Sequence, residues 1–102
     1  MRFLVKVSIP VEAGNAAAKR DGLKVIERIL KDQKPEAVYF VSEQGRRTGL
    51  LFMDLLDASE IPGIAEPWFL ALNAGVELIP AMIPEDLEKG GPAIEKAVGV
   101  YG

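Results

Sequence analysis

Four short stretches of this chain alternate between one set of residues that is uncharged and another that is mixed. Successive side chains of a β-strand point to opposite faces of the sheet, so this period of two predicts strands. The uncharged set consists almost entirely of Val, Ile, Leu, Met and Phe, which indicates a buried sheet face. The predicted strands are Phe3–Ile9, Ala37–Glu43, Thr48–Leu55 and Val76–Met82.

The mixed face is too apolar to lie in water alone. An antiparallel sheet with one wet face normally has polar side chains on that face. Here charged groups alternate with large apolar ones, so we expect helices on the first face and a further surface on the mixed face. The mixed face comprises Leu4, Lys6, Ser8, Ala37, Tyr39, Val41, Glu43, Thr48, Leu50, Phe52, Asp54, Glu77, Ile79 and Ala81.

Helical signals separate the strands. Asn15 is a suitable N-cap, and apolar residues recur at spacings of three and four over Ala16–Gln33, which predicts one helix weakened at Gly22. Asp57 or Ser59 is expected to cap a second helix. A proline inside a helix removes a backbone hydrogen bond, so a kink or break is expected at Pro67.

Turn residues mark the other connections. The segment Glu43–Arg47 is typical of a hairpin loop, with Gly45 available for a positive φ. Pro84 is expected to begin a short helix, and the glycines and proline of 90–92 to end it. A last turn or two of helix is expected over Ala93–Val100.

The order strand, helix, strand, hairpin, strand, helix, strand is the split β-α-β layout. Right-handed crossovers place the strands in the spatial order 4-1-3-2, with both helices on the uncharged face. We therefore predict a single α+β domain over residues 1–102, a ferredoxin-like antiparallel sheet followed by a helical tail.

Composition narrows the classes of partner. The chain has 102 residues, 49% of them hydrophobic and 26% charged, and a net charge of -3 with the two signs interspersed. It lacks the extended positive field that binds nucleic acid, and no apolar run approaches the ~20 residues that cross a bilayer. A strand pattern starts at once after Met1 in place of a signal peptide, so we expect a cytoplasmic protein without nucleic-acid or membrane partners.

The chain contains neither cysteine nor histidine. Their absence excludes Ser-His-Asp and Cys-His catalysis within this chain, and histidine- or thiolate-ligated zinc and haem. Any catalysis must use carboxylates, Lys, Tyr, Arg or a borrowed cofactor, and we expect neither a resident cofactor nor a metal.

Ionisable groups on the mixed face are the candidate catalytic residues: Lys6, Tyr39, Asp54 and Glu77. Enclosure between two sheets would desolvate them and shift their pKa values, so that a carboxylate could accept a proton while Lys6 or Tyr39 stabilises charge on a substrate oxygen. Alternatively, Lys6 forms an ion pair with Asp54 or Glu77 at a dimer interface.

Candidate ligand contacts lie elsewhere as well. Phe52 belongs to the apolar part of the mixed face, and Trp68 could line a pocket with Glu66 supplying a polar contact, or could simply belong to the core. Arg47, next to Arg46 in the hairpin, could bind an anion by paired hydrogen bonds or could be a solvated turn residue.

The opening Met1–Val7, the run Phe52–Leu55 that leads through Asp57 into a helix, and Pro67–Phe69 followed by Val76–Leu78 resemble the small bacterial dimeric α/β-barrel proteins. Within that group the pattern is distantly similar to muconolactone isomerase. The resemblance implies a homodimer whose sheets pair face to face and a small molecule bound without a tightly held cofactor.

Two functional hypotheses follow. The first is a homodimeric protein that binds a small organic molecule between its sheets or serves as an assembly module. The second is a cofactor-independent isomerase or monooxygenase-type enzyme that acts on an aromatic acid or a lactone-like substrate.

Overall fold

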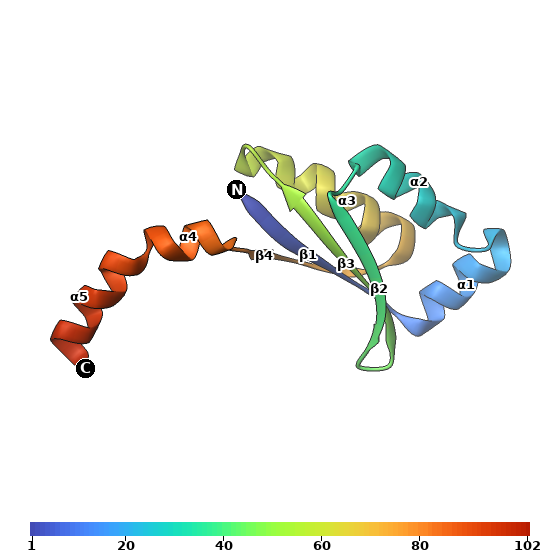
Figure 1. The fold of residues 1–102 in the computed structure, drawn as a ribbon. Helices are drawn as coiled ribbons and strands as arrows, with labels where there is room; N and C mark the ends of the chain where they lie inside the picture. The colour runs from blue at the N-terminus through green and yellow to red at the C-terminus, as the bar shows by residue number, and fades with distance from the viewer.

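The computed structural model describes all of residues 1–102 and contains one four-stranded sheet with five α-helices. The strands are β1 (Arg2–Ile9), β2 (Ala37–Glu43), β3 (Arg46–Asp54) and β4 (Gly75–Pro80). The helices are α1 (Val11–Asp21), α2 (Lys24–Gln33), α3 (Ile61–Leu72), α4 (Pro84–Lys89) and α5 (Gly91–Tyr101), with a 3-10 turn, η1 (Ala58–Glu60), before α3. Helices α1 to α3 lie on one side of the sheet, whereas α4 and α5 project away from it (Figure 1).

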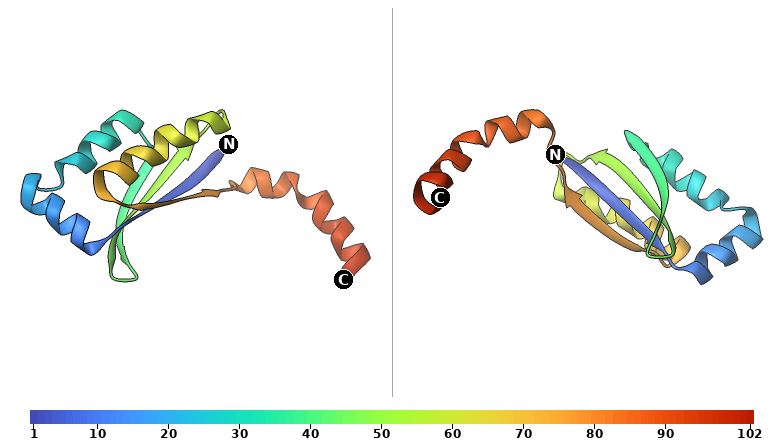
Figure 2. Two further views of the ribbon diagram at one scale, coloured as in Figure 1. Left: turned by 180° about the vertical axis from the view of Figure 1, so that it is seen from behind. Right: turned by 60° about the horizontal axis from the view of Figure 1, so that its bottom comes forward.

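The sheet is antiparallel throughout, in the order β2-β3-β1-β4. This α+β arrangement is consistent with the predicted ferredoxin-like fold. In its register Lys6 of β1 lies opposite Leu50 of β3 and Glu77 of β4. The face that carries the mixed set is called the open face below, because no helix of the chain covers it (Figure 2).

The core lies between the sheet and α1 to α3, as the uncharged set predicts. Val5, Val7 and Leu51 are fully buried there, and Trp68 of α3 packs into the same cluster. Burying such side chains stabilises a fold by roughly 1.5–3 kcal/mol each. The alternation along β1 and β3 therefore decides which face of the sheet the helices cover.

The first helical segment differs from the single helix that the sequence predicts. Helix α1 begins at Val11, directly after Pro10, and not at Asn15. The chain then breaks at Gly22 and Leu23, whose φ angles are 66° and 69°. Asp21 Oδ1 accepts a hydrogen bond from the backbone N–H of Leu23 at 3.0 Å and so holds this left-handed corner.

Helix α3 is not broken at Pro67. A proline leaves the carbonyl four residues earlier without its helical donor. The side chain of Gln33 on α2 supplies one, because its Nε2 donates to the carbonyls of Gly63 at 3.4 Å and of Ile64 at 2.9 Å. Gln33 Oε1 also accepts a hydrogen bond from Trp68 Nε1 at 3.2 Å. The amide of Gln33 therefore satisfies both the carbonyl that Pro67 leaves without a donor and the N–H of Trp68.

The β2–β3 hairpin is tighter than expected. Glu43 pairs with Arg46, so the turn has only Gln44 and Gly45, and both have a positive φ. Strand β3 therefore begins at Arg46, ahead of the predicted start at Thr48.

Helices α4 and α5 form an arm that continues β4 away from the body (Figures 1 and 2). All residues from Pro92 to Gly102 are exposed, and they include Ile94, Val98 and Tyr101. The radius of gyration is 17.2 Å, whereas a compact chain of this length would have about 13 Å. The two helices of the arm therefore do not pack against the body of their own chain.

Candidate functional site

Lys6 is the centre of the polar part of the open face. Its Nζ lies 2.8 Å from Oε1 of Glu43, which comes from the end of β2. This hydrogen bond and the charge of Glu43 raise the pKa of Lys6 above its ordinary value. The ion pair is therefore made with Glu43 and not with Asp54 or Glu77, the partners that the sequence suggested.

A shallow hollow surrounds this pair. Its volume is about 140 Å³, below the roughly 300–1,000 Å³ of typical ligand pockets. One sheet alone therefore does not enclose a ligand here. The hollow is lined by Lys6, Ser8, Glu43, Gln44, Thr48 and Glu77.

The four candidate catalytic residues do not form one cluster. Lys6 and Glu77 are register partners, whereas Tyr39 lies across Leu50 from Lys6, two strand spacings or about 10 Å away. Asp54 is four positions beyond Leu50 on β3, which is about 13 Å along the strand. The Met1 backbone amine donates to Asp54 at 2.7 Å and lowers the pKa of that carboxyl.

Apolar side chains occupy the part of the open face between these groups. The rings of Tyr39 and Phe52 meet edge to face, with centroids 6.5 Å apart and planes at 83°. Tyr39 is nevertheless 62% exposed, and Val41 and Ile79 are also exposed. This surface contains the predicted contact Phe52, and no helix of the chain covers it (Figure 2).

The other predicted ligand contacts lie away from the open face. Trp68 is 1% exposed within the core, where Gln33 accepts its N–H, so it does not line a pocket in this chain. Glu66 is exposed on α3. Arg47 lies opposite Ile9, on the helix-covered side of the sheet.

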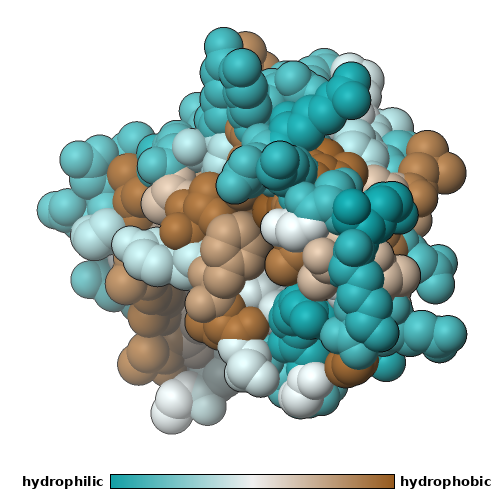
Figure 3. All heavy atoms as spheres, turned by 90° about the vertical axis from the view of Figure 1, so that its right-hand side faces the viewer, coloured by the Kyte–Doolittle hydropathy of each residue, from teal (hydrophilic) through white to brown (hydrophobic).

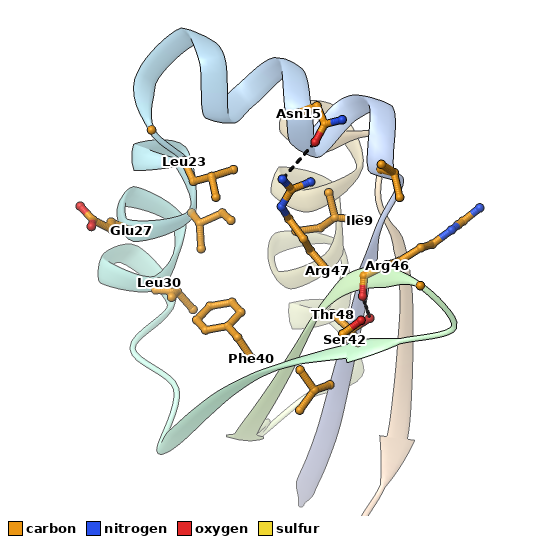
Figure 4. Close-up of a pocket in the computed structure, with 15 residues that line it drawn as sticks. Ile9, Asn15, Leu23, Glu27, Leu30, Phe40, Ser42, Arg46, Arg47 and Thr48 are labelled. Carbon is orange, nitrogen blue, oxygen red and sulfur yellow. Dashed lines mark hydrogen bonds between the residues drawn. The ribbon is translucent and has the colours of Figure 1, made fainter.

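A second concave surface lies around Arg47. A groove of about 630 Å³ opens between α1, α2 and the β2–β3 hairpin, where the helices stop short of the end of the sheet (Figure 4). Leu23, Leu30 and Phe40 point into it, and Arg47 reaches up toward Asn15 of α1. Figure 3, which views this end of the molecule, shows hydrophobic surface between hydrophilic side chains.

Sequence reasoning did not find this groove. Arg47 was a candidate anion contact, but its neighbours Ile9, Leu23 and Phe40 belong to other elements and come together only through the break after α1. The one local signal was Gly14, a residue that disfavours helix, within a helical segment.

Comparisons of the chain with models of protein families, with curated proteins and with solved structures found no match. None of the helices combines the length and the apolar character needed to cross a bilayer. No three Asp or Glu side chains come together as metal ligands. Function is therefore inferred from the chain's own surfaces.

Proposed function

We propose that this chain is the subunit of a homodimer that pairs two open faces and binds a small organic molecule between them. The observation that carries the proposal is the exposure of Tyr39, Val41 and Ile79 on a sheet whose other face is covered by helices. Contiguous exposed apolar side chains usually mark an interface. The resemblance to dimeric α/β-barrel proteins supports the same assembly.

The size of the sheet limits the surface area that face-to-face pairing can bury. Four strands of about seven residues cover roughly 23 Å by 19 Å, or about 440 Å². A standard interface buries about 800 Å² on each partner. Contacts beyond the sheet face would therefore bring the dimer closer to a standard interface.

The arm supplies further surface. Leu87, Ile94, Val98 and Tyr101 are exposed on it, and it continues β4, the strand that carries Ile79 on the open face. In a paired dimer the arm of each subunit docks on the body of its partner. This exchange adds apolar area next to the sheet interface.

The ligand site of this proposal lies beside Lys6. The hollow in one subunit is smaller than a typical ligand pocket, and a second sheet closing over it would enlarge it to a cavity that includes the Lys6–Glu43 ion pair of each subunit. Because Lys6 and Glu77 line the same hollow, they also favour the alternative function, cofactor-independent isomerisation or a monooxygenase-type reaction in which Glu77 accepts a proton and Lys6 stabilises an oxyanion.

Sedimentation equilibrium tests the dimer. We expect wild type to dimerise and Tyr39→Glu to raise the dimer dissociation constant by at least about tenfold, because it places a charge in an apolar interface. Leu70→Glu is the matched control, since Leu70 is 83% exposed on α3 and outside the open face. A monomeric wild type at high concentration would refute the proposal, as would equal effects of the two variants.

Thermal-shift measurements test the ligand. Aromatic acids and lactones are screened against wild type and Lys6→Met, with Lys24→Met on α2 as the control for lost charge. A ligand that stabilises wild type and Lys24→Met but not Lys6→Met supports the site between the sheets. The enzymatic alternative would be favoured if wild type converts such a ligand to a product, and if Glu77→Gln loses this conversion but is still stabilised by the ligand.

A further inference from the structure

The guanidinium of Arg47 packs against helix α1. Asn15 Oδ1 accepts a hydrogen bond from Arg47 Nη2 at 3.0 Å. The buried Gly14 lies beside it, and a Cβ at that position would be 2.6 Å from Nη1 and 3.3 Å from Cδ. Glycine is a poor helix former, yet this helical position has no room for a side chain while Arg47 is in place.

No carboxylate neutralises Arg47. None of the ion pairs of the chain includes it, and its partner Asn15 is uncharged. The nearest carboxylate in the groove lining, Glu27, points away from the interior, and so does Arg46 (Figure 4). A guanidinium has five N–H donors, so Arg47 presents unused donors and an unpaired charge to the groove.

The rest of the groove is apolar. Leu23 and Leu30 form one wall, and the Phe40 ring faces them from β2 (Figure 4). Gly49 lies beside the ring, where an added Cβ would be 3.4 Å from Phe40 Cε1. Phe40 remains 55% exposed, so its ring has an open surface toward the groove and solvent.

We propose that this groove binds a small amphipathic carboxylate, an aliphatic or aryl acid whose carboxylate pairs with Arg47 and whose apolar part contacts Leu23, Leu30 and Phe40. The planar guanidinium matches a carboxylate by two parallel hydrogen bonds. A single directed cation suits a monoanion better than a phosphate dianion. The volume of about 630 Å³ lies within the usual range for ligand pockets.

The groove is on the opposite side of the sheet from the open face. Most of its residues belong to α1, α2 and the helix-covered side of β1 to β3, and only Val41 and Thr48 are shared with the open face. The residues assigned to the ligand, Leu23, Leu30, Phe40 and Arg47, have no role in the dimer proposal. Binding here therefore succeeds or fails independently of pairing between sheets.

Octanoate is the probe, and octan-1-ol is its uncharged counterpart. In a titration followed by the amide resonances of the isotope-labelled full chain, octanoate is expected to shift residues of α1, α2 and the β2–β3 hairpin. We expect Arg47→Gln to weaken octanoate binding by about tenfold or more, the usual effect of losing a charge-assisted hydrogen bond. Arg46→Gln removes the same charge from the neighbouring residue and should leave the affinity unchanged.

A second pair of variants tests the packing of Arg47 against Gly14. Gly14→Ala is expected to displace the guanidinium and weaken octanoate binding several-fold, with the fold retained. Gly63→Ala is the control, because Gly63 is also in the first turn of a helix and a Cβ there meets nothing within 4 Å.

Three results of the binding experiments would overturn the proposal. They are an octanoate affinity that is the same in Arg47→Gln, equal affinities for octanoate and octan-1-ol, and shifts confined to α5 or to the open face. Nuclear Overhauser contacts between α5 and the groove of a second copy would assign the groove to the arm and would also overturn it.

Discussion

Gln44 occupies a turn position that suits other residues better. Both Gln44 and Gly45 have a positive φ, the conformation of a two-residue type I′ turn, which favours Asn-Gly. Asparagine visits this region more readily than glutamine does. We expect Gln44→Asn to raise the free energy of unfolding by roughly 0.5–1 kcal/mol, as measured by urea denaturation. Gln44→Ala keeps the unfavourable φ and should give no such gain; equal values for the two variants would contradict this account.

Asp57 makes the start of α3 sensitive to pH. Its carboxylate accepts a hydrogen bond from the backbone N–H of Ser59 at 2.8 Å, and Glu60 Oε2 accepts one from the backbone N–H of Asp57 at 3.0 Å. The bond from Ser59 lowers the pKa of Asp57 from 3.8. A lowered native-state pKa contributes stability above the unfolded value and loses it as the pH falls through the native value.

Asp57→Ala should therefore reduce the urea midpoint at pH 7, and the difference from wild type should shrink as the pH falls below 3.8. Asp57→Asn retains an acceptor for the Ser59 N–H and should keep most of the midpoint at pH 7. A difference between wild type and Asp57→Ala that is constant from pH 7 to pH 2.5 would show that the charge of Asp57 has no role.

Gly22 decides whether the first helical segment is one helix or two. Its φ is 66°, and a Cβ there would meet no atom within 4 Å, so only backbone conformation opposes a side chain. We expect Gly22→Ala to lower the free energy of unfolding by about 1 kcal/mol. In a continuous helix the same change would stabilise the protein by up to about 1 kcal/mol, so the sign of the measured change distinguishes the two structures.

The success of sequence-based prediction differed between kinds of element. The strands followed from the alternation of residues such as Val5 and Lys6, because one face of the sheet had to be buried. The Asp57 cap is also local, since its partners lie within three residues. The sequence predicted a weak point at Gly22 but not the corner between two helices. The spacing of apolar residues indicates which face of a helix a residue occupies, and it does not indicate the sign of φ.

The candidate sites depended on contacts that no local pattern encodes. Lys6 had three acidic residues available on the same face, and the structure pairs it with Glu43, which lies two strands away at the end of β2. The continuity of α3 through Pro67 likewise depends on Gln33, a polar residue that lies 34 positions earlier in the chain. The groove needs residues from five elements, so it appears only when they are assembled.

At the scale of the whole molecule, the body and the arm differ in stability. The body has a buried core, whereas α5 is exposed throughout and consists of 11 residues. Isolated helices shorter than about 12–15 residues are marginal in water. If the proposed dimer forms, the body of the partner would stabilise the arm, and we expect dimerisation and arm structure to be lost together on dilution.

The temperature of unfolding tests this coupling in one measurement. When folding and association are linked, mass action raises the unfolding temperature with protein concentration. For a dimer of this size we expect about 3 °C for each tenfold increase. Tyr39→Glu should lower the unfolding temperature at each concentration, because a weaker dimer stabilises the fold less, and Leu70→Glu should leave it unchanged. An unfolding temperature that is the same over a hundredfold range of concentration would mean that the open face and the arm stay in water, and that this chain folds as a monomer.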